Sequence, residues 1–163
     1  MENGQFAILE ESTKWPAVTA LAQIGFPTGS ETKGIGAGGP LFGAGFALDK
    51  RYGRFSFNLN GLFFYLQESD FLSELSVNNA FAGSFAAGFA LTPRWTLMVQ
   101  FDGATPLFDG TGVDGLDNGI LQILLGFQYA WNPKNALRVA FIEDPIQDTS
   151  PDFTVSVEWD VRF

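Results

Sequence analysis

The chain has 163 residues, a formal net charge of -9 and only 17% charged side chains, and it contains 18 Phe and 19 Gly but no Cys or His. The negative charge argues against nucleic acid as a partner, because binding to phosphates needs clustered Lys and Arg. No apolar run reaches the ~18 residues of a membrane-spanning helix, so a helical membrane protein is also excluded.

Most of the chain alternates in polarity with the period of two that a β-strand requires. Eight strands are predicted, near residues 17–27, 41–49, 54–66, 80–91, 95–105, 120–131, 135–144 and 153–163. Residues 5–11 alternate poorly, so 1–14 is interpreted as a partial strand or as the remnant of a missing N-terminal region. The prediction is one domain over residues 1–163.

One face of the predicted strands is apolar throughout. In the last strand it carries Phe153, Val155, Val157, Trp159, Val161 and Phe163, while the other face carries small, polar and a few charged side chains. Bulky side chains from eight strands would not fit inside a small barrel, and the polar face holds too few charges for a sheet in water. The bulky face is therefore predicted to face lipid. A soluble, lipocalin-like barrel is the alternative, since it would alternate as well.

A sheet in lipid must close, because every backbone N–H and C=O needs a partner within the protein. The predicted fold is thus an all-β, antiparallel transmembrane β-barrel of about eight strands. Its connections alternate between short turns and long loops, as in bacterial outer-membrane barrels. The turns are rich in Lys and Arg and the loops in Asp and Glu. The prediction also places an aromatic girdle at the short-turn rim, made of Trp15, Trp95, Trp131 and Trp159.

The chain ends on Phe163 after an alternating strand. This ending resembles the C-terminal recognition signal of bacterial outer-membrane proteins, with Trp159, Val161 and Phe163 in the signal positions. The resemblance implies the periplasmic barrel-assembly machinery as a partner. Two stretches, FIEDPIQDTSPDFTVSVEWDVRF (141–163) and LAQIGFPTGS (21–30), also resemble an uncharacterised family of proteobacterial outer-membrane barrels known only as a domain of unknown function.

Barrels of that kind are longer and begin with a signal peptide, and this chain departs from both features. Residues 1–11 have neither the basic region nor the apolar core of a secretory signal. Because a protein bound for the outer membrane needs one, we expect a mature form or the C-terminal part of a larger barrel. A real ninth strand would favour the larger barrel, since bacterial single-chain barrels have even strand numbers.

Catalysis is not predicted. Without His or Cys there is no Ser-His or Cys-His nucleophile pair and no imidazole acid or base, so we predict no enzyme, no cofactor and no metal site. A small solute or divalent cation would bind, if anywhere, at the acidic loops. Their richest stretch, DGTGVDGLDNG (109–119), does not match the ligand spacing of a calcium loop.

Charged residues predicted inside the barrel form its candidate site: Asp102, Arg138, Glu158, Asp160 and Arg162. They would make either a charged constriction that selects solutes or an ion-pair plug, and the narrow interior of an eight-stranded barrel favours the plug. The predicted function is a bacterial outer-membrane barrel with a passive structural or small-solute transport role. The alternative is a small membrane barrel that binds a ligand or surface partner through its long acidic loops.

Overall fold

The structure is a computed structural model of the chain. It describes residues 2–26, 39–66, 76–77, 79–106, 108–112, 117–145 and 153–161. Every regular element of these residues is a β-strand. Within the same residues, no helix has the length and apolar character needed to cross a membrane.

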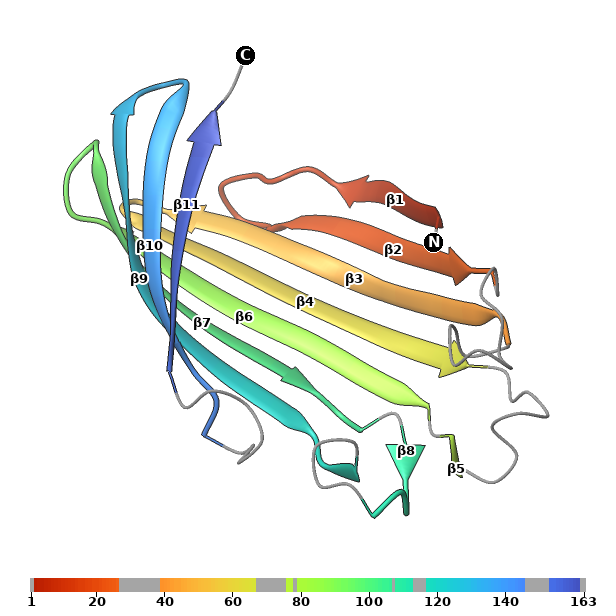
Figure 1. The fold of residues 1–163 in the computed structure, drawn as a ribbon. Coiled ribbons are helices and arrows are strands. Elements are labelled where there is room, and N and C mark those ends of the chain that lie inside the picture. Colours follow the sequence, from red (N-terminus) through yellow and green to blue (C-terminus); the bar gives the residue numbers. More distant parts are fainter. Residues whose placement is uncertain are drawn as a thin grey trace.

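Nine strands form one antiparallel sheet in which each strand lies beside its neighbour in sequence, in the order β1-β2-β3-β4-β6-β7-β9-β10-β11 (Figure 1). Their bounds are β1 Glu2–Leu9, β2 Ala17–Gly25, β3 Leu41–Tyr52, β4 Phe55–Leu66, β6 Ala80–Ala90, β7 Trp95–Ala104, β9 Ile120–Asn132, β10 Asn135–Glu143 and β11 Thr154–Val161. Two short strands, β5 (Ser76–Val77) and β8 (Phe108–Asp109), pair with each other and join two of the long loops.

The antiparallel all-β fold predicted from polarity is confirmed, with two differences. The doubtful N-terminal segment is a full strand, β1, which pairs with β2. Its pairing shifts between Ala7 and Leu9. A bulge of this kind interrupts the alternation of a strand, and it explains why the sequence pattern was weak there. The second difference is that β3 and β4 extend to a two-residue turn, in which Gly53 has a φ of 59°.

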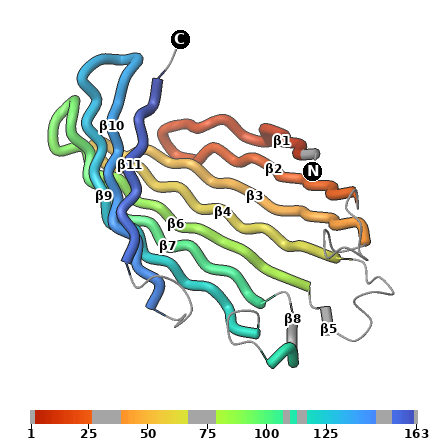
Figure 2. The backbone as a smooth tube through the Cα atoms, in the orientation of Figure 1, coloured from red at the N-terminus to blue at the C-terminus, as the bar shows by residue number. Residues whose placement is uncertain are grey.

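The sheet is curved into an open trough and is not closed into a barrel (Figures 1 and 2). β1 forms one margin of the trough and β11 the other. All short connections lie at one end of the strands, which we call the turn end, and the long connections lie at the other, the loop end. Closure into a barrel is therefore not confirmed, and the structure shows a single curved antiparallel sheet.

The two faces of the sheet differ as the alternation predicts. The outer, convex face carries the large apolar side chains, and most of them are exposed, including Phe46, Phe85 and Phe101. The inner, concave face carries mostly small and polar side chains, with a few larger apolar ones such as Leu21, Leu62 and Phe64. The only buried hydrophobic residues among those described are Leu66, Ala80 and Ala136, and all three lie on inner positions. This single layer therefore has almost no hydrophobic core of its own.

Glycine allows neighbouring strands to approach closely on the inner face, most tightly at Gly45. A methyl group added at Gly45 would overlap the carbonyl oxygen of Gly61 on the neighbouring strand β4. At Gly103, on the outer face of β7, the nearest atom to such a methyl group would be the Ile120 oxygen at 3.5 Å, an ordinary contact. The sheet at β3 and β4 therefore depends on the absence of a side chain at residue 45.

We predict that Gly45→Ala lowers the free energy of unfolding by at least about 1 kcal/mol, because the backbone must shift to admit the methyl group. Gly103→Ala is the matched control, and it should be neutral or slightly stabilising, since alanine loses less conformational entropy on folding. Urea-induced unfolding in detergent micelles would measure both. Equal stability of the two variants would contradict the close approach at Gly45.

Candidate functional site

The inner face carries a polar row that crosses six neighbouring strands in register. Its members, from β2 to β9, are Thr19, Ala47, Asn60, Ser84, Asp102 and Gln122. Because the row runs along the hydrogen-bonding direction of the sheet, its side chains lie side by side on the floor of the trough. Five of its six members carry hydrogen-bonding side chains, and the exception is Ala47.

Side chains in and beside the polar row are hydrogen-bonded to one another. The Asn60 Nδ2 group donates to Ser84 Oγ at 2.9 Å and to Asn58 Oδ1 at 2.8 Å, and Asn58 Nδ2 donates to Asp49 Oδ1 at 2.7 Å. These partners hold the amides in fixed orientations. The sequence signal for this chain of contacts is the alternation FSFNLNG in β4, which places Asn58 and Asn60 on one face.

Asp102 belongs to the polar row. Gln100 Nε2 donates to both of its carboxylate oxygens, at 2.9 and 2.8 Å. Its cross-strand neighbours are Ser84 and Gln122. No cation contacts Asp102 among the described residues, so its negative charge is available to a positively charged solute in the trough.

The second polar group is an ion-pair cluster at the β11 margin, centred on Arg138 of β10. The Arg138 guanidinium donates to Gln128 Oε1 at 3.0 Å, to Glu158 Oε2 at 3.2 Å and to Asp160 Oδ2 at 3.2 Å. The side chains of Arg138, Glu158 and Asp160 are 35%, 60% and 25% exposed, so water reaches the cluster. One guanidinium thus pairs with two carboxylates.

The residues of the predicted interior site therefore fall into two places. The structure brings Arg138, Glu158 and Asp160 together. Asp102 is separate from them. Its cross-strand neighbour in β9 is Gln122, whereas that of Arg138 is Gln128, six residues further along the same strand. That separation is roughly 20 Å along a strand. Arg162 lies outside the described residues.

Two hollows open on the inner face. The larger, of about 730 Å³, lies toward the turn end and is lined by Asn58, Gln100 and Gln128 together with Arg51 and Arg54. The smaller, of about 360 Å³, lies toward the loop end and is lined by the polar row at Asn60, Ser84 and Asp102 and by apolar residues such as Leu21, Leu62 and Ile120. The polar row and the end of β3 thus form walls that a small polar solute could contact.

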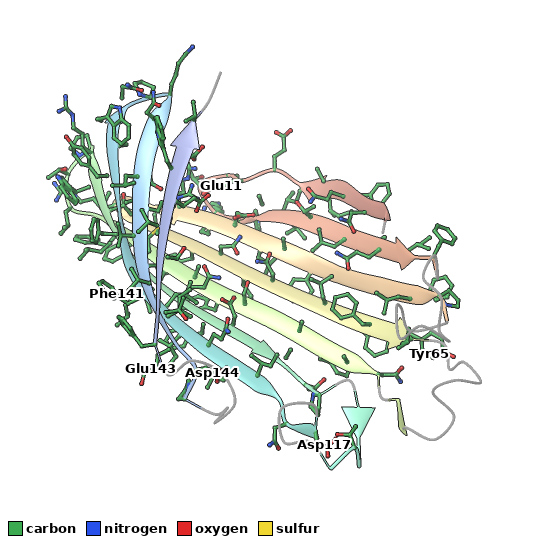
Figure 3. The ribbon with its side chains drawn as sticks, viewed as in Figure 1. Glu11, Tyr65, Asp117, Phe141, Glu143 and Asp144 are labelled. Carbon is green, nitrogen blue, oxygen red and sulfur yellow. The ribbon has the colours of Figure 1, made fainter. Side chains whose placement is uncertain are left out.

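The connection between β1 and β2 is fastened to the end of β3, a contact that the sequence pattern did not predict. Glu11 accepts a hydrogen bond from the Arg51 backbone N–H at 2.7 Å, and its Oε1 lies 3.6 Å from Lys50 Nζ. The Lys50 ammonium also donates to the carbonyl oxygens of Ser12 and Trp15. Glu11 lies at the turn end, opposite Tyr65 and Asp117 at the loop end (Figure 3).

We predict a pH-dependent loosening of this turn. The Arg51 N–H and then the Lys50 charge hold the pKa of Glu11 below its ordinary value of 4.5. The stabilisation is therefore complete above pH 4.5 and is lost as the pH falls through the lower pKa of the folded chain. The Arg51 amide shift, followed by NMR, should move with a midpoint below 4.5. Glu11→Gln should abolish this titration, whereas Glu10→Gln should leave it unchanged.

Aromatic side chains form a continuous chain on the outer face near the turn end. Trp95 packs on Tyr129 with ring centroids 4.7 Å apart, Tyr129 on Trp131 at 6.4 Å, and Trp131 on Trp159 at 6.3 Å. These three tryptophans of the predicted girdle are therefore in one band across β7, β9 and β11. The fourth, Trp15, is 65% exposed in the β1–β2 connection at the same end.

A second aromatic band lies at the loop end of the same face. Phe63 packs on Phe81 with ring centroids 4.9 Å apart, and Phe141 packs on Phe153 at 5.7 Å. Tyr65 is 47% exposed beside them in β4. The outer face is thus apolar along its length and aromatic at both ends.

The acidic loops fall largely outside the described residues. In the described part, Asp117 accepts hydrogen bonds from the Thr111 N–H and hydroxyl at 2.9 and 2.7 Å and from the Gly112 N–H at 3.0 Å. These bonds, led by the Thr111 hydroxyl, lower the pKa of Asp117. No group of three or more His, Cys, Asp or Glu with the geometry of a metal site occurs within the residues that the structure covers.

Comparison with family models gives one match, "Protein of unknown function (DUF3187)", over residues 39–163. The chain belongs to the DUF3187 family. The predicted membership of an uncharacterised family is thereby confirmed, and the stretch 141–163 that resembled such a family lies inside the match. No curated protein matches this DUF3187 chain. The match extends from the beginning of β3 through β11, so it includes both the polar row and the Arg138 cluster.

Proposed function

We propose that this chain forms part of the wall of a bacterial outer-membrane β-barrel that allows small polar solutes to pass or serves as a passive structural barrel. The observation that carries the proposal is the outer face, where large apolar side chains are exposed along all nine strands while only three described hydrophobic residues are buried. A soluble monomer seldom exposes a contiguous apolar surface of this extent. Lipid is the solvent that would cover it favourably.

The dimensions of the outer face support the same medium. Phe55 and Tyr65 lie near the two aromatic ends of β4, ten residues apart. That spacing is roughly 33 Å along a strand. For a strand tilted by about 40°, it corresponds to about 25 Å across the membrane, the height of the apolar band in outer-membrane barrels. The aromatic bands at both ends would lie at the two lipid interfaces.

The inner face supports passage of a polar solute. Its polar row, two hollows and exposed Arg138 cluster offer hydrogen-bonding groups to water and to solutes along the trough. The charged residues of the inner face include Asp102, Glu158, Asp160 and Arg138, and Arg51 and Arg54 line the larger hollow. A polar solute would therefore meet charges of both signs along the trough.

Lipid contact can be tested with a matched pair of probes, because the chain has no native Cys. Phe85→Cys and Ser84→Cys place a fluorophore on the outer and inner faces of β6 at adjacent residues. In vesicles that contain brominated lipids, we expect strong quenching at residue 85 and weak quenching at residue 84. Equal quenching at both positions, or failure to associate with vesicles, would refute the membrane assignment.

Binding of a surface partner at the loop end is the second candidate function. The observation that favours it is the pairing of β5 with β8, which ties together the loops before β6 and after β7. Conductance across a planar bilayer separates the two candidates. Steady channels would favour solute passage, and a membrane-inserted but silent protein would favour the binding role.

We further propose that the barrel-assembly machinery recognises the C-terminal strand through Trp159, Val161 and Phe163. Deletion of Phe163 should then reduce the amount of assembled protein in cells several-fold while refolding into detergent remains nearly unchanged, because one terminal aromatic side chain contributes at most about 1.5 to 3 kcal/mol. Protease protection in outer-membrane fractions would measure assembly. Normal assembly of the deletion variant would exclude the recognition signal.

A further inference from the structure

The two margins of the sheet are strands that each have one unpaired side. Among the residues that the structure describes, β1 pairs only with β2, and β11 pairs only with β10. Alternate residues of an edge strand direct their N–H and C=O groups away from the sheet, where they can bind another strand. Neither Lys nor Pro, two residues that commonly protect such edges, occurs in β1 or β11, although β1 contains a bulge and β11 carries Glu158 and Asp160 on its inner face. Both margins therefore leave backbone groups that another strand could bind.

The directions of the strands limit what can pair with them. The nine strands alternate in direction, so β1 and β11 both run toward the turn end (Figure 2). Direct closure of β1 on β11 would therefore create a parallel pair in a sheet in which all eight existing pairs are antiparallel. An antiparallel closure requires one, three or another odd number of strands between them.

A second copy of the chain does not meet this requirement. Two copies inserted in the same orientation would bring β11 of one against β1 of the other, and that junction is again parallel. An antiparallel junction between two β11 strands, or between two β1 strands, would require one copy to be inverted across the membrane. This step rests on the proposed membrane location, whereas the open edges and the strand directions do not depend on it.

We propose that the gap between β1 and β11 is filled by an odd number of additional antiparallel β-strands that are not a second copy of this chain. The inner side of the strand beside β11 should carry Lys or Arg, because the Glu158 carboxylate is 60% exposed there. Its outer side should carry apolar residues that extend the surface of Val155, Val157 and Trp159, which are 50%, 66% and 65% exposed.

Hydrogen exchange tests whether the edges accept such strands. The probes are two synthetic peptides, with the sequences of residues 17–25 for β1 and 135–143 for β11, since each is the natural antiparallel neighbour of that edge. In vesicles, the amides of β1 and β11 in the chain alone should exchange much faster than those of β4 and β6. Both peptides together should slow exchange in β1 and β11 at least tenfold, and scrambled peptides should not.

Cysteine cross-linking distinguishes the competing closures. Phe6→Cys in β1 would be combined in turn with Val155→Cys, Val157→Cys and Trp159→Cys in β11. Under oxidation we expect no efficient disulfide for any pair. An intramolecular disulfide would show that β1 closes directly on β11, and an intermolecular one would show a second copy in the gap.

Four results would overturn the proposal. Two are the intramolecular and the intermolecular disulfide. The third is hydrogen exchange in β1 and β11 of the chain alone that is as slow as in β4 and β6, and the fourth is exchange that the matching peptides do not slow. Loss of lipid quenching at residue 85 would instead refute the membrane location and leave these edge measurements interpretable, because exchange and cross-linking can be repeated in detergent micelles. The two proposals can therefore fail separately. Slow exchange at the edges only with the matching peptides, and no disulfide, is the result that supports odd-numbered strand addition.

Discussion

Phe85→Arg is expected to lower the free energy of unfolding in lipid vesicles by about 2 to 4 kcal/mol, the cost of an Arg on the lipid face at the middle of a barrel. Phe85 is 40% exposed on the outer face of β6, and its cross-strand neighbours are Leu59 and Phe101. No acidic side chain is among these neighbours. The guanidinium would therefore have to reach the interface or draw water into the apolar band.

The same substitution near the turn end is the matched control. Phe55 lies on the same face as Phe85. Leu59 is the cross-strand neighbour of Phe85 in β4, and Phe55 lies four residues from Leu59, about 13 Å closer to the turn end. Phe55→Arg should cost only about 0 to 1 kcal/mol, because the charge is near the interface. Equilibrium refolding from urea into vesicles measures both. If the outer face were in water, Phe85→Arg would change stability by no more than about 0.5 kcal/mol, and the depth dependence would disappear.

Arg138→Gln is expected to lower the free energy of unfolding by about 2 kcal/mol. Hydrogen bonds to charged groups contribute about 1.5 to 3 kcal/mol each when they are shielded, and exposed pairs contribute less than about 1 kcal/mol. Arg138 makes three such bonds, and its side chain is 35% exposed. Each bond should therefore contribute at the exposed end of this range, and together they account for about 2 kcal/mol. The substitution also leaves Glu158 and Asp160 as two carboxylates without their shared cation.

Two comparisons isolate the contribution of the Arg138 geometry. Arg138→Lys keeps the charge but not the forked hydrogen bonds, and we expect about half of the loss. Arg54→Gln removes a positive charge that makes no hydrogen bond or ion pair with the described residues, so it should change stability by no more than about 0.5 kcal/mol. Urea titration in the same vesicles would rank the three variants. An Arg138→Gln variant as stable as Arg54→Gln would mean that the cluster is not a stabilising ion pair.

Much of the sheet could be predicted from polarity alone, because each strand of a one-layer sheet has one apolar and one polar face. The eight predicted strands lie within a few residues of β2, β3, β4, β6, β7, β9, β10 and β11. The ninth was missed as a full strand because the bulge after Ala7 breaks the alternation. Closure could not be predicted from the pattern, since alternation specifies the faces of a strand and carries no information on what pairs with the outermost ones.

The candidate site was predictable only in part, for a related reason. Alternation assigns Asp102, Arg138, Glu158 and Asp160 to one face of their strands, but it does not say how far along each strand a residue lies. The pairing register supplies that position, and it separates Asp102 from Arg138. The contacts of Lys50 with the β1–β2 connection could not be predicted from the sequence, because every residue has a backbone carbonyl and no residue type marks the one that accepts the bond.

The near absence of buried side chains changes how this protein should respond to mutation. In a globular protein, shortening a large core residue leaves an empty space, and the loss of stability depends on how far the surroundings collapse into it. If the outer face lies in lipid as proposed, shortening Phe101 or Leu125, which are 41% and 57% exposed, would leave no such void, because lipid chains would fill the space. The loss should then follow the removed apolar area alone, at about 25 cal/mol per Å². Truncations scattered over the outer face would consequently be additive, and in the proposed bilayer the thickness of the hydrocarbon region would also alter stability, by a fraction of a kcal/mol per Å of mismatch.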